Sequence, residues 1–283
     1  LTLSDSDDTQ FTAATVTISS GLTSGDTLGF TTQNGISGSY NSGTGVLTLS
    51  GTATVAQYQS ALRSVTYINS TDDLTSTSAS RTISWQVTDA NSDGAGAQNS
   101  SSVTSTINIT ATNDTPVATA GATLAYSENG SAAAIDTSIT LSDVDDSQIA
   151  GATVTLSSGF TSGDTLGFST QNGISGSYNS STGVLTLSGT ATVAQYQAAL
   201  RTVTYSSSSE DPTSGSASRT VSWQVTDANS DGDGAQNSSA VTSTINLTAS
   251  NDTPVATAGA TLAYSENGSA AAIDNTIALS DSD

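Results

Sequence analysis

Residues 185–197 read LTLSGTATVAQYQ, and the same stretch stands unchanged at residues 47–59. The two stretches are 138 positions apart, and Trp85 recurs as Trp223 at the same distance (223 − 85 = 138). Self-similarity at a fixed period indicates an array of modules. A period of this length is too long for one coil of a solenoid and is typical of a complete domain. The chain is therefore predicted to be a tandem array.

The register of the repeat predicts three modules. Residues 1–113 form a first module that lacks its early strands, residues 114–251 form a complete module, and residues 252–283 supply the early strands of a third. The chain opens at LTLSDSDD and closes at IALSDSD, at the same phase of the repeat, without a starting Met or a signal peptide. We expect it to be a fragment of a longer array.

The complete module is predicted to be all-β with one short helix. Apolar and polar residues alternate along it, as they do in half-buried strands. The expected strands lie at residues 122–126, 139–141, 152–156, 165–169, 174–178, 184–187, 201–205, 220–226 and 241–248. Trp223 alternates with Val221 and Val225, so it is expected in the core, and the same holds for Trp85. Regularly spaced strands of this kind are typical of a Greek-key β-sandwich.

The helix is predicted at residues 192–199, within the stretch quoted above. Thr192 caps its start, and Gln195 three residues later completes a capping box. Tyr196 and Leu200 fall at helical spacing, so one side of the helix is expected to pack on the sandwich.

The composition is strongly acidic and lacks several reactive residue types. The formal net charge is −21, from 25 acidic residues against four basic ones, all Arg, and the chain has no Lys, His, Cys or Met. Such a chain repels nucleic acid and anionic membranes. The missing residues exclude disulfides, thiol nucleophiles and His-dependent triads, so no enzyme is predicted. No apolar run approaches the roughly 20 residues that span a bilayer.

The acidic residues gather in loops, where their oxygens suit a hard cation such as Ca²⁺ and not zinc or copper. Three groups recur: Asn-Asp-Thr-Pro at 113–116 and 251–254, an early Glu with an acidic loop at 128 and 142–146, and Asp-Ala-Asn-Ser-Asp-Gly at 89–94 and 227–232. The candidate metal ligands are Asp5, Asp7, Asp89, Asn91, Asp93, Asn113, Asp114, Glu128, Asp143, Asp145, Asp146, Asp227, Asn229, Asp231, Asn251, Asp252, Glu266, Asp281 and Asp283.

The Asp-Ala-Asn-Ser-Asp-Gly loop has two interpretations. Oxygens at its first, third and fifth positions with Gly at the sixth match the start of an EF-hand calcium loop. The flanking helices and the Glu at position 12 are missing, since Ser100 and Ser238 stand there. The alternative is an Asx-rich hairpin turn, which Asp, Asn and Gly favour for backbone reasons alone.

Taken together, these motifs resemble the cadherin-like repeats of giant bacterial surface proteins, close to VCBS-type and RTX-adhesin-like extender repeats. Residues 113–116 are similar to the cadherin DxNDNxP linker, Asp143-Val-Asp145 to the DxD motif, and Glu128 to the early-strand Glu of cadherins. The chain departs from the pattern at Thr115, where cadherins have a second Asn. The cadherin DRE motif has no clear match, and Asp89 and Asp227 are the candidates to replace it.

The resemblance implies cadherin-like or immunoglobulin-like sandwiches with calcium between modules. Asn113, Asp114, Asp143 and Asp145 would share calcium at one junction, and the equivalent residues would build the next, namely Glu128, Asn251, Asp252, Asp281 and Asp283. The implied function is that of a non-enzymatic extracellular stalk or filament, rigidified by calcium, in a bacterial adhesin or biofilm matrix. The expected partners are calcium ions, neighbouring copies of the repeat, and a host or biofilm surface.

Other functions are compatible with parts of the sequence. Residues 254–283 resemble strands without a body to pack on, so chains could assemble into a filament by strand complementation. An intact mass near 28 kDa for the native material would favour that alternative. A glycan-binding module is a further alternative, with Tyr40 and Tyr178 as candidate platforms. The acidic pairs at 72–73 and 210–211 match the residue types of a glycosidase, but they are adjacent in a polar loop and are expected to be solvated.

Overall fold

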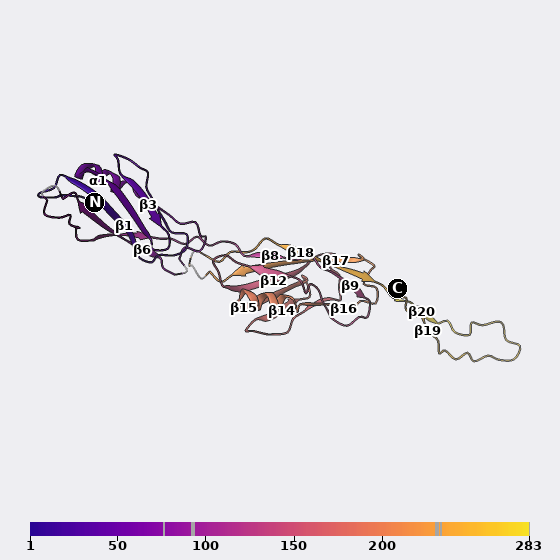
Figure 1. Cartoon of the computed structure of the whole chain (residues 1–283). Coiled ribbons are helices and arrows are strands. Elements are labelled where there is room, and N and C mark those ends of the chain that lie inside the picture. Colours follow the sequence, from indigo (N-terminus) through magenta and orange to yellow (C-terminus); the bar gives the residue numbers. More distant parts are fainter. Residues whose placement is uncertain (76, 92–93, 230–231, 233, 283) are drawn as a thin grey trace. The chain divides into compact units, whose positions relative to one another are not determined.

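The computed structural model describes residues 1–283 except 76, 92–93, 230–231, 233 and 283 (Figure 1). The chain divides into two compact units, which are unit 1 (Leu1–Asn113 with Asp231–Gly234) and unit 2 (Asp114–Ser230 with Ala235–Asp283). Strands dominate both units, and each unit has one short helix. The predicted all-β fold class is therefore confirmed, while the division into three modules stays a prediction.

Unit 2 contains the complete copy of the repeat. In chain order its elements are β8 (Val117–Thr119), β9 (Thr123–Ser127), β10 (Ala133–Ala134), β11 (Thr140–Ser142), β12 (Gln148–Ser158), β13 (Asp164–Gly167), β14 (Ser175–Asn179), β15 (Val184–Thr192), α2 (Val193–Leu200), β16 (Thr204–Ser207), β17 (Ser218–Asp227) and β18 (Val241–Thr248). Every strand expected from the sequence overlaps one of these, and β8 and β10 are additional.

The strands of unit 2 form a sandwich whose order differs from their order in the sequence. The large sheet runs β14-β15-β12-β17-β18-β9, the smaller one β10-β16-β13, and β8 pairs with β11. All pairs are antiparallel except β18 with β9, which is parallel. Alternate residues of both sheets point into one core, including Val154 and Trp223 of the large sheet and Leu166 and Tyr205 of the smaller one.

Helix α2 begins as the sequence predicts. The Thr192 hydroxyl accepts from the backbone N–H of Gln195, and the Gln195 side chain accepts from the N–H of Thr192. Tyr196 and Leu200 are fully buried on the core side. The Tyr196 hydroxyl donates to the carbonyl oxygen of Gly189 at 2.6 Å, so its buried polar atom has a partner.

Unit 1 repeats this architecture without the strands that open the module. Its elements are β1 (Gln10–Ser20), β2 (Thr27–Gly29), β3 (Ser37–Asn41), β4 (Val46–Thr54), α1 (Val55–Arg63), β5 (Thr66–Ile68), β6 (Ser80–Asp89) and β7 (Val103–Asn108). They form the sheets β3-β4-β1-β6-β7 and β2-β5. Trp85 on β6 is only half-buried, so the prediction that it lies in the core is only partly correct. Trp223 is fully buried in unit 2, whereas no described strand of unit 1 covers Trp85 in the same way.

Each unit also encloses a buried ion pair that the sequence does not reveal. Arg81 Nε lies 2.8 Å from Asp26 Oδ2, and the equivalent Arg219 and Asp164 atoms lie 2.6 Å apart, with all four side chains fully buried. Burial alone would raise the pKa of Asp26. Hydrogen bonds that its carboxylate accepts from Tyr67, Asn69, Thr23 and Arg81 outweigh burial and lower this pKa to about 2. A buried pair of this kind adds little net stability, but the loss of one partner leaves an uncompensated buried charge.

The chain continues beyond β18 as a tail, defined here as residues 254–283. Among its described residues the regular secondary structure is the short hairpin of β19 (Val255–Thr257) and β20 (Ala278–Ser280). Its apolar side chains are exposed, with Tyr264 at 57% and Ile273 at 79%.

Candidate metal centre

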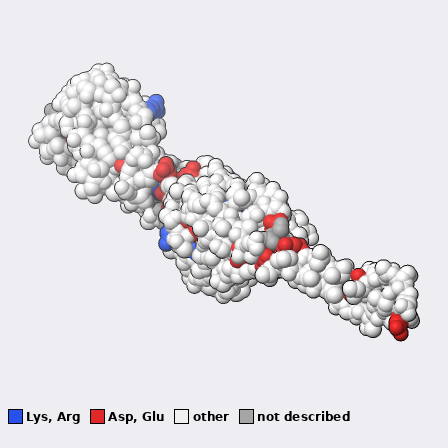
Figure 2. All heavy atoms as spheres, turned by 90° about the vertical axis from the view of Figure 1, so that its right-hand side faces the viewer, with Lys and Arg blue, Asp and Glu red and all other residues white. Residues whose placement is uncertain are grey.

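Two groups of carboxylates gather at opposite ends of the sheet of unit 2. In each group, one oxygen of every member lies within 4.8 Å of the others. The first group, called cluster A, is Asp143, Asp146 and Asp227; the second, called cluster B, is Glu128, Glu210 and Asp252. Figure 2 shows that acidic side chains on the face in view gather in patches, while most of the surface is uncharged.

Cluster A forms where an acidic loop meets the end of β17. Asp143 Oδ1 accepts from the backbone N–H groups of Asp145 at 3.4 Å and Asp146 at 3.2 Å, which curls the loop into an Asx turn. Ile149 at the start of β12 pairs with Asp227 at the end of β17, so this sheet register brings the aspartate to the loop. Asp146 and Asp227 are buried, at 4% and 0% exposure.

The electrostatics of cluster A are unfavourable without a cation. Asp143 Oδ2 and Asp145 Oδ1 are buried and have no hydrogen-bond partner among the described residues. Burial, together with the neighbouring Asp145 carboxylate, raises the pKa of Asp143 from its ordinary 3.8 to about 6. Both causes act against the ionised carboxylate, and a bound cation would oppose both.

Asp114 and Asp145 lie beside cluster A. The Asp114 N–H donates to Asp145 Oδ2 at 2.8 Å, which ties the first residue of unit 2 to the acidic loop. Asn113 is buried, and its side-chain amide donates to the carbonyl oxygen of Gly234 at 2.7 Å. The sequence therefore named the residues of this loop and of the linker, but its grouping of them with calcium stays a prediction.

The Asp-Ala-Asn-Ser-Asp-Gly loop begins at Asp227. The Asp227 carboxylate accepts from the N–H of Asn229 at 3.2 Å and from the N–H of Gln236 at 3.0 and 2.9 Å. This Asn229–Asp227 hydrogen bond is the one expected if the loop is an Asx-rich turn. The same Asp227 carboxylate also belongs to cluster A. Its second acidic residue lies outside the described residues in both copies, as Asp93 and Asp231.

Cluster B forms where β9 and β18 end side by side. Glu128 is 6% exposed and follows β9, and its Oε2 accepts from the N–H of Ser250 at 2.7 Å. Its other oxygen, Oε1, is buried and has no hydrogen-bond partner in the described part of the chain. Asn129 Nδ2 lies 3.5 Å from Glu210 Oε2, and Asp252 follows β18 in the linker.

Glu210 is the member of cluster B that sequence reasoning missed. It was expected to be solvated, because it lies in a polar loop beside Asp211. Its side chain is exposed, but the loop after β16 places its carboxylate beside that of Glu128. The two residues are 82 positions apart in the sequence (210 − 128). Asp8 was missed too, although it is the counterpart of Asp146 and is 7% exposed; the register alone would have identified it.

The remaining candidates lie in less complete surroundings. Asn251 is exposed, and its side chain donates to the backbone oxygen of Asp252 at 2.9 Å. Glu266 and Asp281 are exposed in the tail, and Asp283 lies outside the described residues.

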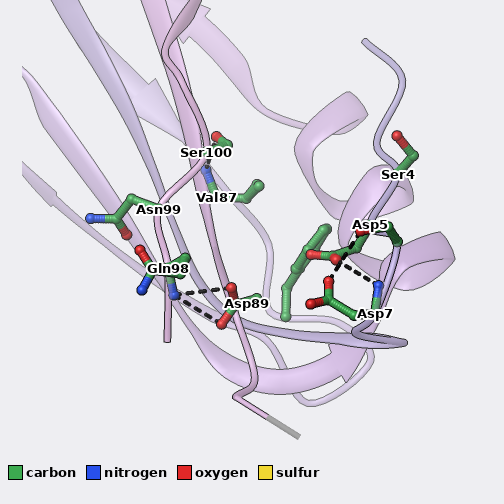
Figure 3. Close-up of a pocket in the computed structure, with 10 residues that line it drawn as sticks. Ser4, Asp5, Asp7, Val87, Asp89, Gln98, Asn99 and Ser100 are labelled. Carbon is green, nitrogen blue, oxygen red and sulfur yellow. Dashed lines mark hydrogen bonds between the residues drawn. The ribbon is translucent and has the colours of Figure 1, made fainter. Parts of the chain in front are cut away.

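The counterparts of cluster A in unit 1 are Asp5, Asp8 and Asp89. Asp5 and Asp89 line a cavity of about 670 Å³, together with Asp7, the counterpart of Asp145. Figure 3 shows Asp7 and Asp89 on facing sides of this cavity, with the Gln98 N–H bonded to the Asp89 carboxylate. Asn91 is exposed nearby, and its side-chain oxygen accepts from Gly96. Among the described residues, groups of three carboxylates as close as those of clusters A and B occur only in unit 2.

The tyrosines proposed as glycan platforms have an internal role. The hydroxyls of Tyr40 and Tyr178 donate to the backbone oxygens of Asp26 and Asp164 at 2.9 and 2.8 Å. Both side chains are partly buried against the cores. Neither α1 nor α2 is long and apolar enough to cross a membrane, and this holds for all helices among the described residues.

Comparison with known proteins gives a partial sequence similarity and a remote structural one. No family model matches the chain. A stretch of 113 residues, 38% of the chain, is 39% identical to Halomucin of Haloquadratum walsbyi and covers 1% of that protein. The chain thus spans about 1% of the length of this curated relative.

Solved structures that resemble the chain include cadherin ectodomains. The protocadherin gammaB7 EC3-6 cis-dimer has a TM-score of 0.32 at 14% identity, over 82% of this chain and 44% of that one. Human CDH23 EC21-23 has a TM-score of 0.33 at 12% identity, over 98% of this chain and 74% of that one. Mouse protocadherin-24 EC1-3 has a TM-score of 0.31 at 12% identity, over 79% of this chain and 59% of that one. The fold class itself rests on the strand topology described above.

Proposed function

We propose that the chain is a non-enzymatic, extracellular structural repeat that binds Ca²⁺ at clusters A and B. The observation that carries this proposal is the set of buried carboxylate oxygens with no described hydrogen-bond partner, on Glu128, Asp143 and Asp145. A buried, uncompensated carboxylate is strongly unfavourable, so such oxygens point to a ligand that the chain itself does not contain.

The arginines of the chain do not supply the missing positive charge. Arg81 and Arg219 are committed to the buried ion pairs. Arg63 and Arg201 donate to the backbone oxygens of Leu1 and Ile139. Since the chain has no Lys or His, the compensating cation has to come from solution.

The donor chemistry favours calcium over other cations. Each cluster offers three carboxylates, with no sulfur or imidazole ligand anywhere in the chain. Ca²⁺ takes six to eight oxygen ligands, whereas zinc and copper prefer nitrogen and sulfur. In cluster A the ligands would be Asp143, Asp146 and Asp227, with Asp145 beside them; in cluster B they would be Glu128, Glu210 and Asp252. Backbone oxygens and water would complete the coordination.

Ion binding would stiffen the places where the chain enters and leaves the body of unit 2. Asp114 is bonded to Asp145, so an ion on the acidic loop also orders the start of the unit. Asp252 follows β18, so an ion on cluster B orders its exit. A ligand that binds only the folded form stabilises it by RT ln(1 + [L]/Kd), about 2.7 kcal/mol at 100 times Kd.

We infer a role as one repeat in the stalk or filament of a surface adhesin or biofilm matrix. The 138-residue register supports an array, and the match to 1% of Halomucin supports the use of related modules within very long chains. Calcium-dependent stiffness is the property that such an array would contribute.

Calorimetry of the chain with and without calcium tests this function. Calcium is expected to raise the melting temperature of unit 2. Asp143→Asn is expected to raise that temperature in metal-free buffer, because it removes a buried charge, and to reduce the calcium-induced increase. The Asn oxygen can still accept the loop hydrogen bonds, so the turn should persist. Equal melting temperatures with and without calcium would contradict the proposal.

Two adjacent acids provide a matched control for cluster B. Glu210→Gln is expected to weaken calcium binding at cluster B about tenfold or more, because it removes one of three ligand charges. Asp211→Asn removes the same charge one residue later, outside the cluster, and is expected to leave affinity nearly unchanged. Titration calorimetry distinguishes the two; similar losses would mean that only overall acidity matters.

A further inference from the structure

Cluster B takes its carboxylates from both sheets of unit 2. Glu128 follows β9 and Asp252 follows β18, which belong to the large sheet, whereas Glu210 follows β16 of the smaller sheet. One oxygen of each lies within 4.8 Å of the others. The separation of these carboxylates therefore depends on how the ends of the two sheets are held together.

On the side of the large sheet, Glu128 is fixed by its own backbone and by one of its oxygens. Its N–H donates to the backbone oxygen of Thr248, the last residue of β18, at 2.9 Å. Its Oε2 accepts from the N–H of Ser250 at 2.7 Å. The carboxylate is thus already oriented, with the buried Oε1 left for a ligand.

The Tyr126 hydroxyl joins this side to the smaller sheet. It donates to the backbone oxygen of Gly130 at 2.5 Å and so braces the turn that carries Glu128. It also accepts from the backbone N–H of Ser207, the last residue of β16, at 3.2 Å. Figure 1 shows β9 and β16 at the same end of unit 2. One side-chain oxygen therefore bonds both segments that lead to Glu128 and Glu210.

The position of this hydroxyl is itself set by packing. Tyr126 is 3% exposed, and its ring packs edge-on against Tyr205 of β16, with ring centroids 5.0 Å apart. The Tyr205 hydroxyl in turn donates to the buried Asp164 carboxylate at 2.6 Å. In a close-packed core such a pair of rings moves only together with its neighbours. The link between the sheets is therefore stiff.

The loop that carries Glu210 is held on its far side as well. Arg219 Nη2 donates to the backbone oxygen of Pro212 at 2.9 Å, and both residues are buried. Glu210 lies between this anchor and Ser207, so its backbone is held on both sides although its side chain is exposed. How near it comes to Glu128 depends on where β16 ends, which is where the tyrosine hydroxyl bonds.

Unit 1 holds the same loop position in a different way. Asn69 is the counterpart of Ser207 (207 − 138 = 69), and its side-chain amide donates to Asp26 Oδ1 at 2.7 Å. The shorter Ser207 uses its side chain within the loop, where its Oγ accepts from the N–H of Ser209 at 3.3 Å. In unit 2 the start of this loop is tied across the sandwich through Tyr126.

We propose that Tyr126 is a positioning residue of cluster B, whose hydroxyl sets the separation of the Glu128 and Glu210 carboxylates before an ion binds. The inference rests on the calcium function proposed above. Carboxylates that are close together repel each other while the site holds no cation, so the site opens unless the chain holds it. A site that is held at its working separation binds the ion with a smaller loss of conformational freedom. Tyr126 acts through the position of Glu210 and does not touch the ion.

Two tyrosines of unit 2 provide a matched pair for the test. Tyr126→Phe keeps the ring and removes the hydroxyl. Tyr196→Phe is the control, because Tyr196 is also buried and its hydroxyl donates to a glycine carbonyl, that of Gly189, outside the loops of cluster B. Each change removes a buried hydrogen bond, so the melting temperatures of the metal-free chains should fall by similar amounts.

Titration calorimetry with calcium chloride measures the effect on the site. All chains carry Asp143→Asn, which weakens cluster A, so that differences between them report cluster B. Tyr126→Phe is expected to weaken calcium binding about fivefold or more, somewhat less than the loss typical of groups bonded directly to a metal ligand. Tyr196→Phe is expected to leave the affinity unchanged. Equal affinities in the two variants would overturn the proposal.

A double-mutant cycle with Glu210→Gln separates positioning from a general effect on the fold. If Tyr126 acts through Glu210, Tyr126→Phe should weaken binding less than about twofold in the Glu210→Gln chain. A loss that is the same with and without Glu210 would overturn the proposal. Absence of calcium binding in the unaltered chain would overturn the proposed function as well. Binding that Glu210→Gln weakens and Tyr126→Phe leaves unchanged would overturn this inference alone.

Discussion

Units 1 and 2 are nearly the same sequence, yet equivalent residues differ in their surroundings. Ile245 of unit 2 is fully buried, and its counterpart Ile107 is only partly so. Ser243 is 2% exposed, whereas Ser105 is exposed. The difference follows from β8, β9 and β10, which precede the body of unit 2 in the chain and have no described counterpart in unit 1. The repeat is thus one sandwich whose covering strands come first, so burial depends on context as well as on residue type.

The largest expected effect should be common to both units. Asp164→Ala would leave Arg219 buried without its partner, and breaking such a pair costs about 3–5 kcal/mol of unfolding free energy. Asp26→Ala should do the same to unit 1, because the two networks are equivalent. Calorimetry should show one transition lowered in each variant. A variant that lowers both transitions equally would mean that the units do not unfold separately.

A second pair of changes should separate the two contexts. Tyr126→Ala removes a buried ring that packs edge-on against Tyr205 at 5.0 Å, and such truncations cost about 3–5 kcal/mol. Tyr264→Ala makes the same change in the tail, where the ring is 57% exposed, and should alter stability by about 0.5 kcal/mol or less. Urea denaturation measures both, and similar effects would contradict the described difference in burial.

Cluster A should give unit 2 a dependence on pH. Because the pKa of Asp143 is raised from 3.8 to about 6, its contribution to metal-free stability is fully present below pH 3.8 and is lost as the pH rises through about 6. Calcium requires the ionised carboxylate, so the calcium-induced rise in melting temperature should grow over the same interval and level off above it. Melting curves in calcium and in metal-free buffer measure this. A calcium effect that is constant across the interval would count against cluster A.

The smallest expected effect should again be equal in both units. Thr192→Ala and Thr54→Ala each remove the side-chain half of a capping box, at a cost of about 1 kcal/mol. Because α1 and α2 have the same cap geometry, the two losses should agree. A clear difference in urea denaturation would show that the covering strands also influence the helix.

The parts of the fold that depend on local sequence patterns were predictable. The alternation of β12 and the capping box of α2 identify a strand and a helix start without any distant contact. The half-burial of Trp85 was not predictable from its local pattern, which matches that of Trp223. The two differ in their surroundings: β8 lies against β17, whereas no described strand of unit 1 takes that place beside β6.

The candidate site was predictable in composition and less so in grouping. The acidic loop at 143–146 and Glu128 stand out as clustered oxygens in turns. Glu210 does not, since an adjacent acidic pair in a Ser-rich loop is typical of solvated surface. The order of the strands decides which acids meet, and that order is set by packing over the whole sandwich.

By itself, the sequence determined the period of the repeat, the all-β class, the helix start and the acidic loops, because each depends on residues that are near one another in the chain. Only the tertiary structure decided that Asp146 meets Asp227, that Glu128 meets Glu210 and Asp252, and that Arg219 is buried against Asp164. These contacts join residues far apart in the sequence. Where both side chains are buried, as in the pair of Arg219 and Asp164, water no longer screens their charges.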